Sequence, residues 1–227
     1  MVVKMGFLPL FKNGVEGFSI EEMTPPELWF ADDIDGPWEW KGPVARGGAC
    51  AYGKLYGSKA GFVSLDWLPH LINWRRSVAP PFTPREEMVY NTLVARESML
   101  SKEIKRECGF TAPREPQPFA ASALNAAERA LERRARRPQG EGYETLITRL
   151  QMETYVIAAD FEYLTDKRGH PYGWGIARYT TPELMFGPEA ALACDGCTPQ
   201  ESRRRMLCHL ASLLPQATEE QLLKIIG

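Results

Sequence analysis

The sequence predicts an α+β protein. Between Thr83 and Tyr179, three segments with helix-forming patterns are followed by two strand-like segments that a charged, glycine-containing turn joins. The preceding residues hold five of the six tryptophans and many glycines and prolines, which indicates short strands and irregular loops around an aromatic core. We therefore predict an aromatic-rich N-terminal α+β region (1–80), a unit of helices and a hairpin (81–186), and a helical C-terminal tail (187–227).

The N-terminal region carries short, separate signals. Ser19 and Thr24 each stand three residues before a glutamate, the spacing of a capping box, and indicate two helix starts around a short turn. Residues 32–37, rich in Asp, Gly and Pro, predict a loop. Residues 49–56 and 61–65 predict two short strands joined around a glycine-containing turn.

Two helices are predicted at the start of the middle region. Thr83 and Glu86 form a capping box with Pro84 at the first helical position, and an apolar face continues up to Ser101. Ser101 can cap a second, short helix over residues 102–108, which the following glycine would end. The two segments have the outline of a helix-turn-helix.

A third helix follows a long interruption. Residues 111–121 contain three prolines and predict a loop, and residues 122–137 contain strong helix formers that predict an inserted helix. Residues 143–152 have the most regular amphipathic pattern of the chain, with apolar side chains at i, i+3, i+4 and i+7. These side chains are Tyr143, Leu146, Ile147 and Leu150.

The third helix is followed by a predicted hairpin. Residues 154–164 are rich in aromatic and β-branched side chains, residues 166–171 form a charged turn, and residues 172–179 return as an aromatic strand. Three helices and such a hairpin have the order of a winged helix. Residues 143–152 then take the position of the recognition helix, and the hairpin is the wing.

The C-terminal tail is predicted to be helical. Pro182 opens it, residues 200–214 have a helical composition, and Thr218 caps a last helix that runs to Ile226.

The overall composition excludes several classes of protein. Lys and Arg total 27 against 29 Asp and Glu, so any contact with nucleic acid needs a local basic patch. The apolar first ten residues are broken by Lys4 and Pro9, which argues against a signal peptide and a membrane span. We therefore expect a cytoplasmic protein with no membrane partner, whose five cysteines are reduced thiols.

Two blocks of the sequence resemble a known family. The first spans residues 27–41, with Leu-Trp-Phe, an acidic run and Asp-Gly-Pro-Trp-Glu-Trp-Lys, and continues at residues 51–54; the second comprises residues 150–155 and 169–175. Together they resemble the small bacterial proteins described as AlkZ-related, relatives of a DNA glycosylase built from winged helices. The resemblance implies a winged-helix architecture and an association with DNA.

The same resemblance suggests one group of candidate catalytic residues. The family's enzyme uses a Gln, apolar, Gln motif to position water at the sugar carbon of an alkylated nucleotide. The nearest string here is Gln151, Met152 and Glu153, which departs from that motif at its last residue. Gln151 and Glu153 are therefore candidates on this resemblance alone.

A second group of candidate catalytic residues lies in the acidic, tryptophan-rich loop. Base excision needs a carboxylate or amide near the anomeric carbon and a pocket with aromatic walls for the base. Asp35 and Glu39, near Trp29 and Trp38 in the sequence, could supply both. The alternative is a solvated acidic loop that its tryptophans anchor to the core. If the protein has a ligand pocket, we expect it here.

The cysteines do not predict a metal site. Cys194 and Cys197 form a single Cys-x-x-Cys pair, with Cys208 and His209 further along the chain. Four zinc ligands can be drawn from them, but adjacent helical positions point in different directions, which makes joint ligation by Cys208 and His209 awkward. We expect structural thiols, no bound metal and no cofactor.

Candidate nucleic-acid contacts lie where a winged helix would meet phosphates, on the second helix, the recognition helix and the wing. Each has an alternative, because nearby carboxylates allow such cations to form a solvated surface of mixed charge. They are Lys102, Lys105, Arg106, Arg149, Lys167 and Arg168.

Three classes of function remain open. The first is association with nucleic acid, double-stranded DNA in particular, through the recognition helix and the wing. The second is a base-excision enzyme that resembles a DNA glycosylase. The third is a protein-interaction module that packs on a protein partner or on a second copy of itself, which the near-neutral charge permits.

Overall fold

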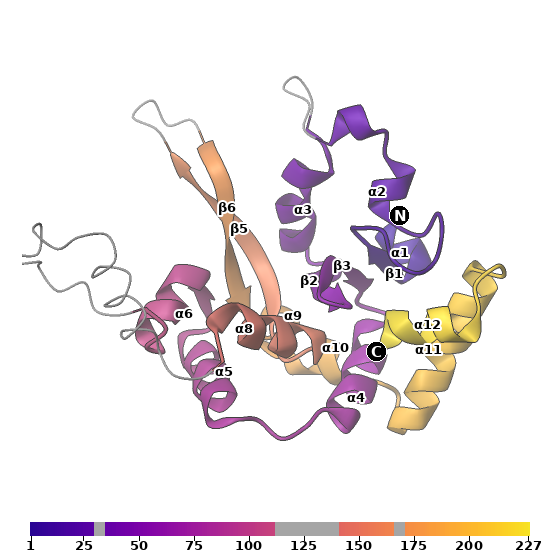
Figure 1. Cartoon of the computed structure of the whole chain (residues 1–227). Coiled ribbons are helices and arrows are strands. Elements are labelled where there is room, and N and C mark those ends of the chain that lie inside the picture. Colours follow the sequence, from indigo (N-terminus) through magenta and orange to yellow (C-terminus); the bar gives the residue numbers. More distant parts are fainter. Residues whose placement is uncertain (30–34, 112–140, 166–170) are drawn as a thin grey trace, which may run out of the picture.

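The computed structural model describes residues 1–29, 35–111, 141–165 and 171–227 (Figure 1). Within these residues the chain forms two three-stranded antiparallel sheets with helices around them. The prediction of an α+β fold is confirmed.

The first sheet belongs to the N-terminal region and has the order β1-β3-β2. β2 (Cys50–Tyr56) and β3 (Lys59–Ser64) form a hairpin, and β1 (Phe7–Pro9) pairs with the other edge of β3. Gly57 and Ser58 both have positive φ, the geometry of a tight two-residue turn. The predicted pair of strands is confirmed, whereas β1, with three residues, is too short to produce a pattern.

The prediction of short strands and irregular loops in this region is wrong for residues 37–46 and 68–78, which form helices. α3 (Pro37–Arg46) contains Trp38, Glu39 and Trp40. Its proline stands at the first helical position, and a carboxylate oxygen of Glu39 accepts the N–H of Gly36 at 2.9 Å, which stabilises the helix start. Two helices lie where the helix-start signals predicted them: the side chain of Ser19 caps α2 (Ile20–Met23), and the 3₁₀ helix η1 (Pro26–Leu28) follows Thr24, although Pro25 takes its cap position. The remaining helices here are α1 (Val2–Met5) and α4 (Leu68–Val78).

The second sheet belongs to the middle region and has the order β4-β6-β5. β5 (Ile157–Thr165) and β6 (Pro171–Thr180) form the predicted hairpin, which projects away from the helices in Figure 1. β4 (Ser98–Leu100) pairs with the other edge of β6 and was not predicted, because three residues carry no periodicity.

Three helices of the middle region confirm the predicted ones: α5 (Pro84–Arg96), α6 (Ser101–Glu107) and α8 (Tyr143–Met152). Ser101 is the first residue of α6 and not its cap. Leu100 takes the cap position, and its N–H donates to the Glu103 carboxylate at 2.8 Å. The predicted helix over residues 122–137 lies outside the described residues, as does all but the first residue of the predicted loop before it.

The C-terminal tail is helical, as predicted. The threonine hydroxyls of Thr181, Thr198 and Thr218 each accept a backbone N–H at a helix start. None of the described helices is long and apolar enough to cross a membrane. The helices of the tail are α9 (Pro182–Phe186), α10 (Pro188–Leu192), α11 (Pro199–Leu213) and α12 (Glu219–Ile226).

The first sheet separates two clusters of buried apolar side chains. Successive residues of a strand point to opposite faces, and accordingly Leu8 and Phe62 belong to one cluster whereas Phe7 and Val63 belong to the other. The first cluster continues into α5, α8 and the second sheet, and the second continues into α4, α11 and α12. Both clusters thus contain residues from more than one of the three predicted regions, whose boundaries at residues 80 and 186 stay a prediction.

A buried arginine joins three of these elements. The guanidinium of Arg75, on α4, donates to the carbonyl oxygens of Leu55 (2.7 Å), Met152 (2.9 Å), Ile225 (3.1 Å) and Ile226 (2.8 Å). Only 6% of the residue is exposed, and burial lowers its pKa to about 10. These bonds fix the ends of β2, α8 and α12 against α4.

Candidate functional site

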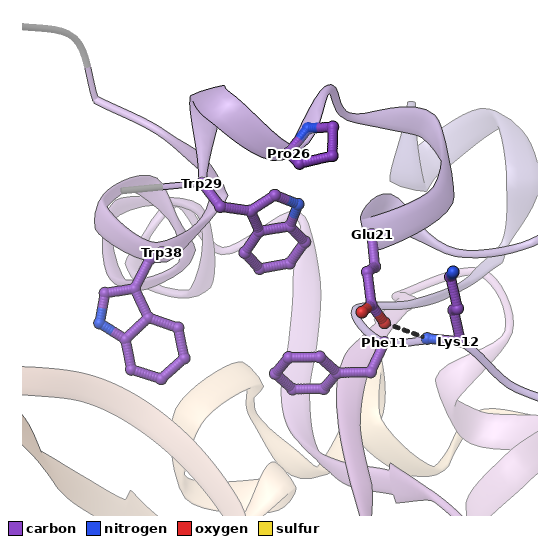
Figure 2. Close-up of a pocket in the computed structure, with 6 residues that line it drawn as sticks. All are labelled: Phe11, Lys12, Glu21, Pro26, Trp29 and Trp38. Carbon is purple, nitrogen blue, oxygen red and sulfur yellow. Dashed lines mark hydrogen bonds between the residues drawn. The ribbon is translucent and has the colours of Figure 1, made fainter. Parts of the chain in front are cut away.

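A cavity of about 360 Å³ opens in the N-terminal region, between the segment after β1, α2, η1 and the first turn of α3 (Figure 2). Three of the side chains around it are aromatic. The rings of Phe11 and Trp29 are stacked, with their centroids 6.0 Å apart and their planes 18° apart. In Figure 2, Trp38 lies across the opening from Glu21 and Lys12. Among the described residues, the wall consists of Phe11, Lys12, Glu21, Pro26, Trp29 and Trp38.

The polar side of the cavity has the carboxylate of Glu21, whereas the ammonium of Lys12 points away from the aromatic rings in Figure 2. An oxygen of Glu21 accepts the backbone N–H of Lys12 at 2.7 Å, which holds α2 next to the segment after β1. The Nζ of Lys59 donates to the carbonyl oxygen of Lys12 at 2.6 Å and fixes the same segment from β3. The backbone of this side is therefore held in place, while the side chain of Lys12 is exposed.

A second lysine lies against one of the tryptophans. Lys41 is 2% exposed, and its Nζ donates to the backbone carbonyl of Trp38. This nitrogen lies 3.7 Å from the centroid of the Trp38 ring and 4.7 Å from that of Phe161. Burial lowers the pKa of Lys41 to about 8, and the charge of Glu39 partly opposes that shift. The ammonium is thus still largely protonated at neutral pH and makes cation–π contacts with both rings.

The two acidic candidates of the tryptophan-rich segment are separate from the cavity wall. Asp35 is exposed at the start of α3, and Glu39 is engaged in the cap of that helix. The pocket expected in this segment thus uses Trp29 and Trp38 from it, but its carboxylate comes from Glu21, on another element.

The other catalytic candidates, Gln151 and Glu153, lie at the end of α8. Both the oxygen and the nitrogen of the Gln151 side-chain amide form hydrogen bonds within the protein. The amide oxygen of Gln151 accepts the N–H of Lys54 at 3.0 Å, and its amide nitrogen donates to the carbonyl of Ile147 at 3.0 Å. Glu153 is half-buried, and burial together with the charge of Glu86 raises its pKa. Within the described part of the chain, no hydrogen bond or ion pair joins Gln151 or Glu153 to Asp35 or Glu39.

The predicted basic contacts on α6 and α8 divide into two kinds. Lys105 forms an ion pair with Glu144 at 2.6 Å. Arg149 lies between Glu141, 2.6 Å away, and the buried Glu86. Both cations are therefore already paired with carboxylates, Lys105 with the exposed Glu144 at the surface.

Two further predicted contacts on α6 differ from these. Lys102 and Arg106 are exposed, and neither forms an ion pair with a described residue. They are four positions apart, so they share one face of the helix. Lys167 and Arg168 lie outside the described residues, between β5 and β6 in the sequence.

Cys194, Cys197, Cys208 and His209, the four zinc ligands considered from the sequence, do not come together in the structure. The Nε2–H of His209 donates to the carbonyl oxygen of Met5 at 2.9 Å, and its ring stacks on that of Trp67 with the centroids 4.3 Å apart. The thiol of Cys194 contacts the carbonyl of Cys197 instead of a metal partner. Across the residues that the structure describes, no group of three or more His, Cys, Asp or Glu side chains could hold a metal ion.

Three residues of the cavity were not anticipated from the sequence. Phe11, Lys12 and Glu21 precede the tryptophan-rich block and carry no motif; only the pairing of β1 with β3 and the position of α2 bring them next to it. The helix-start signal at Ser19 was the one available hint, because it places Glu21 in the first turn of a helix.

Comparison with known proteins gives one result. A family model described as "AlkZ related" matches residues 1–227. No curated protein and no solved structure matches the chain. Because the match extends over the whole chain, the protein belongs to the AlkZ-related family.

Proposed function

We propose that residues 81–186 form a winged helix and that the chain associates with double-stranded DNA through it. The order of elements carries this proposal: α5, β4, α6 and α8 precede the β5–β6 hairpin, and β6 lies between β4 and β5 in the sheet. Three helices thus accompany a three-stranded sheet whose last two strands project as a wing. Membership of the AlkZ-related family supports the same interpretation.

The surface of α8 argues against direct reading of bases by this helix. Its apolar face is buried, and Lys54 donates to the hydroxyl of Thr148 at 3.0 Å from the side of β2. Glu144 and Thr145, in its first turn, are its exposed side chains, and the cation of Arg149 is already paired with carboxylates. A helix that presents an acidic side chain and no unpaired cation is poorly suited to phosphates or base edges.

The proposed contacts therefore lie on α6 and on the wing. Lys102 and Arg106 present two positive charges on one exposed face of α6. Lys167 and Arg168, which stand between β5 and β6 in the sequence, add two more positive charges. Contacts of this kind go to the phosphate backbone, so we expect weak, sequence-independent and salt-sensitive binding.

Charge reversal on α6 tests the proposal. We expect fluorescence anisotropy to detect binding of a labelled duplex at low salt, and the double variant Lys102→Glu/Arg106→Glu to weaken it by about tenfold or more, since two phosphate contacts are lost. Lys4→Glu/Arg204→Glu makes the same change in net charge at two exposed positions away from this unit and serves as the control. The single variant Arg168→Glu tests the wing.

Two results would contradict the proposal. Equal weakening by both double variants would show that only the total charge matters. No binding to the duplex at low salt would leave the winged helix as a protein-interaction module.

A further inference from the structure

We propose that the cavity between Phe11, Trp29 and Trp38 binds an uncharged planar heteroaromatic ring of the nucleobase class. The site is separate from the proposed DNA-binding face on α6, since all the described residues of its wall belong to the N-terminal region.

The aromatic walls select a flat ligand. Phe11, Trp29 and Trp38 come from three separate segments, yet their rings surround one opening (Figure 2). Aromatic faces stack on any π-system, and a base gains affinity from each such face. The volume of about 360 Å³ lies near the lower end of the range of roughly 300–1,000 Å³ for small-molecule sites, which suits one ring system and not a larger ligand.

The polar side of the cavity matches the edge of a nucleobase. The carboxylate of Glu21 can accept hydrogen bonds from the donors on that edge. Nucleobases carry donors and acceptors next to each other on one edge.

Lys41 disfavours a cationic ring. Its ammonium lies 3.7 Å from the centroid of Trp38, although Lys41 itself is not part of the described cavity wall. A cation that already occupies the π-system of Trp38 repels a second cation stacked on the same ring. An uncharged base is therefore favoured over one that methylation has made positive.

Two sources can supply such a ring. One is a free nucleoside or base. The other is a base that has left the stack of a nucleic-acid strand, and for this source the inference rests on the proposed function. Both place the same chemical group in the cavity, and the test distinguishes them.

The test uses the indole N–H signals of the ¹⁵N-labelled full-length protein together with calorimetric titration. Adenosine is the probe, N1-methyladenosine is its cationic counterpart, and ribose is the non-aromatic control. The signals of Trp38 and Trp74 are assigned by their loss in Trp38→Leu and Trp74→Leu. Trp74 is a matched control, because it is likewise half-buried but lies on α4 and contacts Gly227 and Arg203.

We expect adenosine to shift the Trp38 signal and to leave that of Trp74 in place, and ribose to shift neither. Trp38→Leu should weaken adenosine binding by about five- to 150-fold, the range for loss of one stacking face, whereas Trp74→Leu should not change it. Phe11→Leu and Glu21→Gln are independent variants of the same wall and should also weaken binding. N1-methyladenosine should bind more weakly than adenosine.

Several results would overturn the inference: no shift of the Trp38 signal at millimolar adenosine, equal effects of the two tryptophan variants, or tighter binding of the methylated nucleoside. A single-stranded oligonucleotide identifies the source. Shifts of Trp38 by adenosine alone indicate a free compound, and shifts by both indicate a base of a strand. Adenosine binding that survives in Lys102→Glu/Arg106→Glu separates this site from the proposed DNA-binding face.

Discussion

Replacing Arg75 by methionine should destabilise the protein severely. Four carbonyl oxygens would lose their donor: those of Leu55, Ile225 and Ile226, which are buried, and that of Met152, which is partly buried. Each buried acceptor left without a partner costs about 1–3 kcal/mol. Removing the guanidinium also removes the cost of burying its charge, which the lowered pKa reflects. We therefore expect a net loss of about 3–5 kcal/mol in the free energy of unfolding.

Urea unfolding followed by tryptophan fluorescence measures this loss. A domain with a typical stability of about 5–15 kcal/mol would lose about a fifth of it or more. Arg75→Lys keeps the charge but reaches fewer of the carbonyls, so it should fall between the wild type and the methionine variant. Arg204→Met, at an exposed position of α11, should change stability by less than about 0.5 kcal/mol. A loss below about 1 kcal/mol in Arg75→Met would refute the view that this side chain holds β2, α8 and α12 together.

Three further predictions concern other contacts. Gln151→Leu should lower the free energy of unfolding by about 1–3 kcal/mol, because the Lys54 N–H and the Ile147 carbonyl lose a hydrogen-bond partner. Thermal melting measures this loss, with Thr145→Ala on the same helix as the control. If Gln151→Leu and Thr145→Ala melt at the same temperature, a structural role of the glutamine is contradicted. Gly36→Ala should lower the free energy of unfolding by about 1–3 kcal/mol, since a Cβ there would lie 2.1 Å from the Leu28 carbonyl oxygen. Gly142→Ala, where a Cβ would have no neighbour within 4 Å, should be nearly neutral in the same urea denaturation. Although burial alone would raise it, hydrogen bonds from Thr83 and Arg149 hold the pKa of Glu86 below its usual range. The stability contributed by Glu86 is thus present above its unfolded pKa near about 4.3 and is lost as the pH falls through the lower folded value. Urea midpoints from about pH 6 to 3 should therefore fall less steeply in Glu86→Gln than in the wild type, and parallel curves would contradict this.

Local signals predicted the elements that begin with a cap or carry a long apolar stripe. The capping box of Thr83 and Glu86 and the stripe of residues 143–152 both correspond to helices of the structure. α4 has no side-chain cap, and in α3 the sequence Gly-Pro indicates a turn as readily as a helix start. Helices of this kind are decided by packing, which a single sequence does not display.

The site was less predictable than the fold because its residues are distant in sequence. Trp29 and Trp38 were expected near a pocket, but Glu21 and Phe11 join them only through the packing of α2 and the pairing of β1. The ion pairs of Arg149 could not be predicted from the sequence either. One of its carboxylate partners, Glu86, lies 63 positions away in the chain. Whether a cation is available for phosphate depends on such long-range pairs, which composition and spacing do not reveal.

The salt dependence of duplex binding tests the central claim, that the chain contacts DNA phosphates through α6 and the wing. The slope of the logarithm of the binding constant against the logarithm of the salt concentration counts the phosphates contacted, at about 0.9 per contact. Lys102→Glu/Arg106→Glu should reduce the magnitude of this slope by about 1.8, and Lys4→Glu/Arg204→Glu should leave it unchanged. An unchanged slope in the α6 variant would contradict the account, because these two side chains would then contact no phosphate.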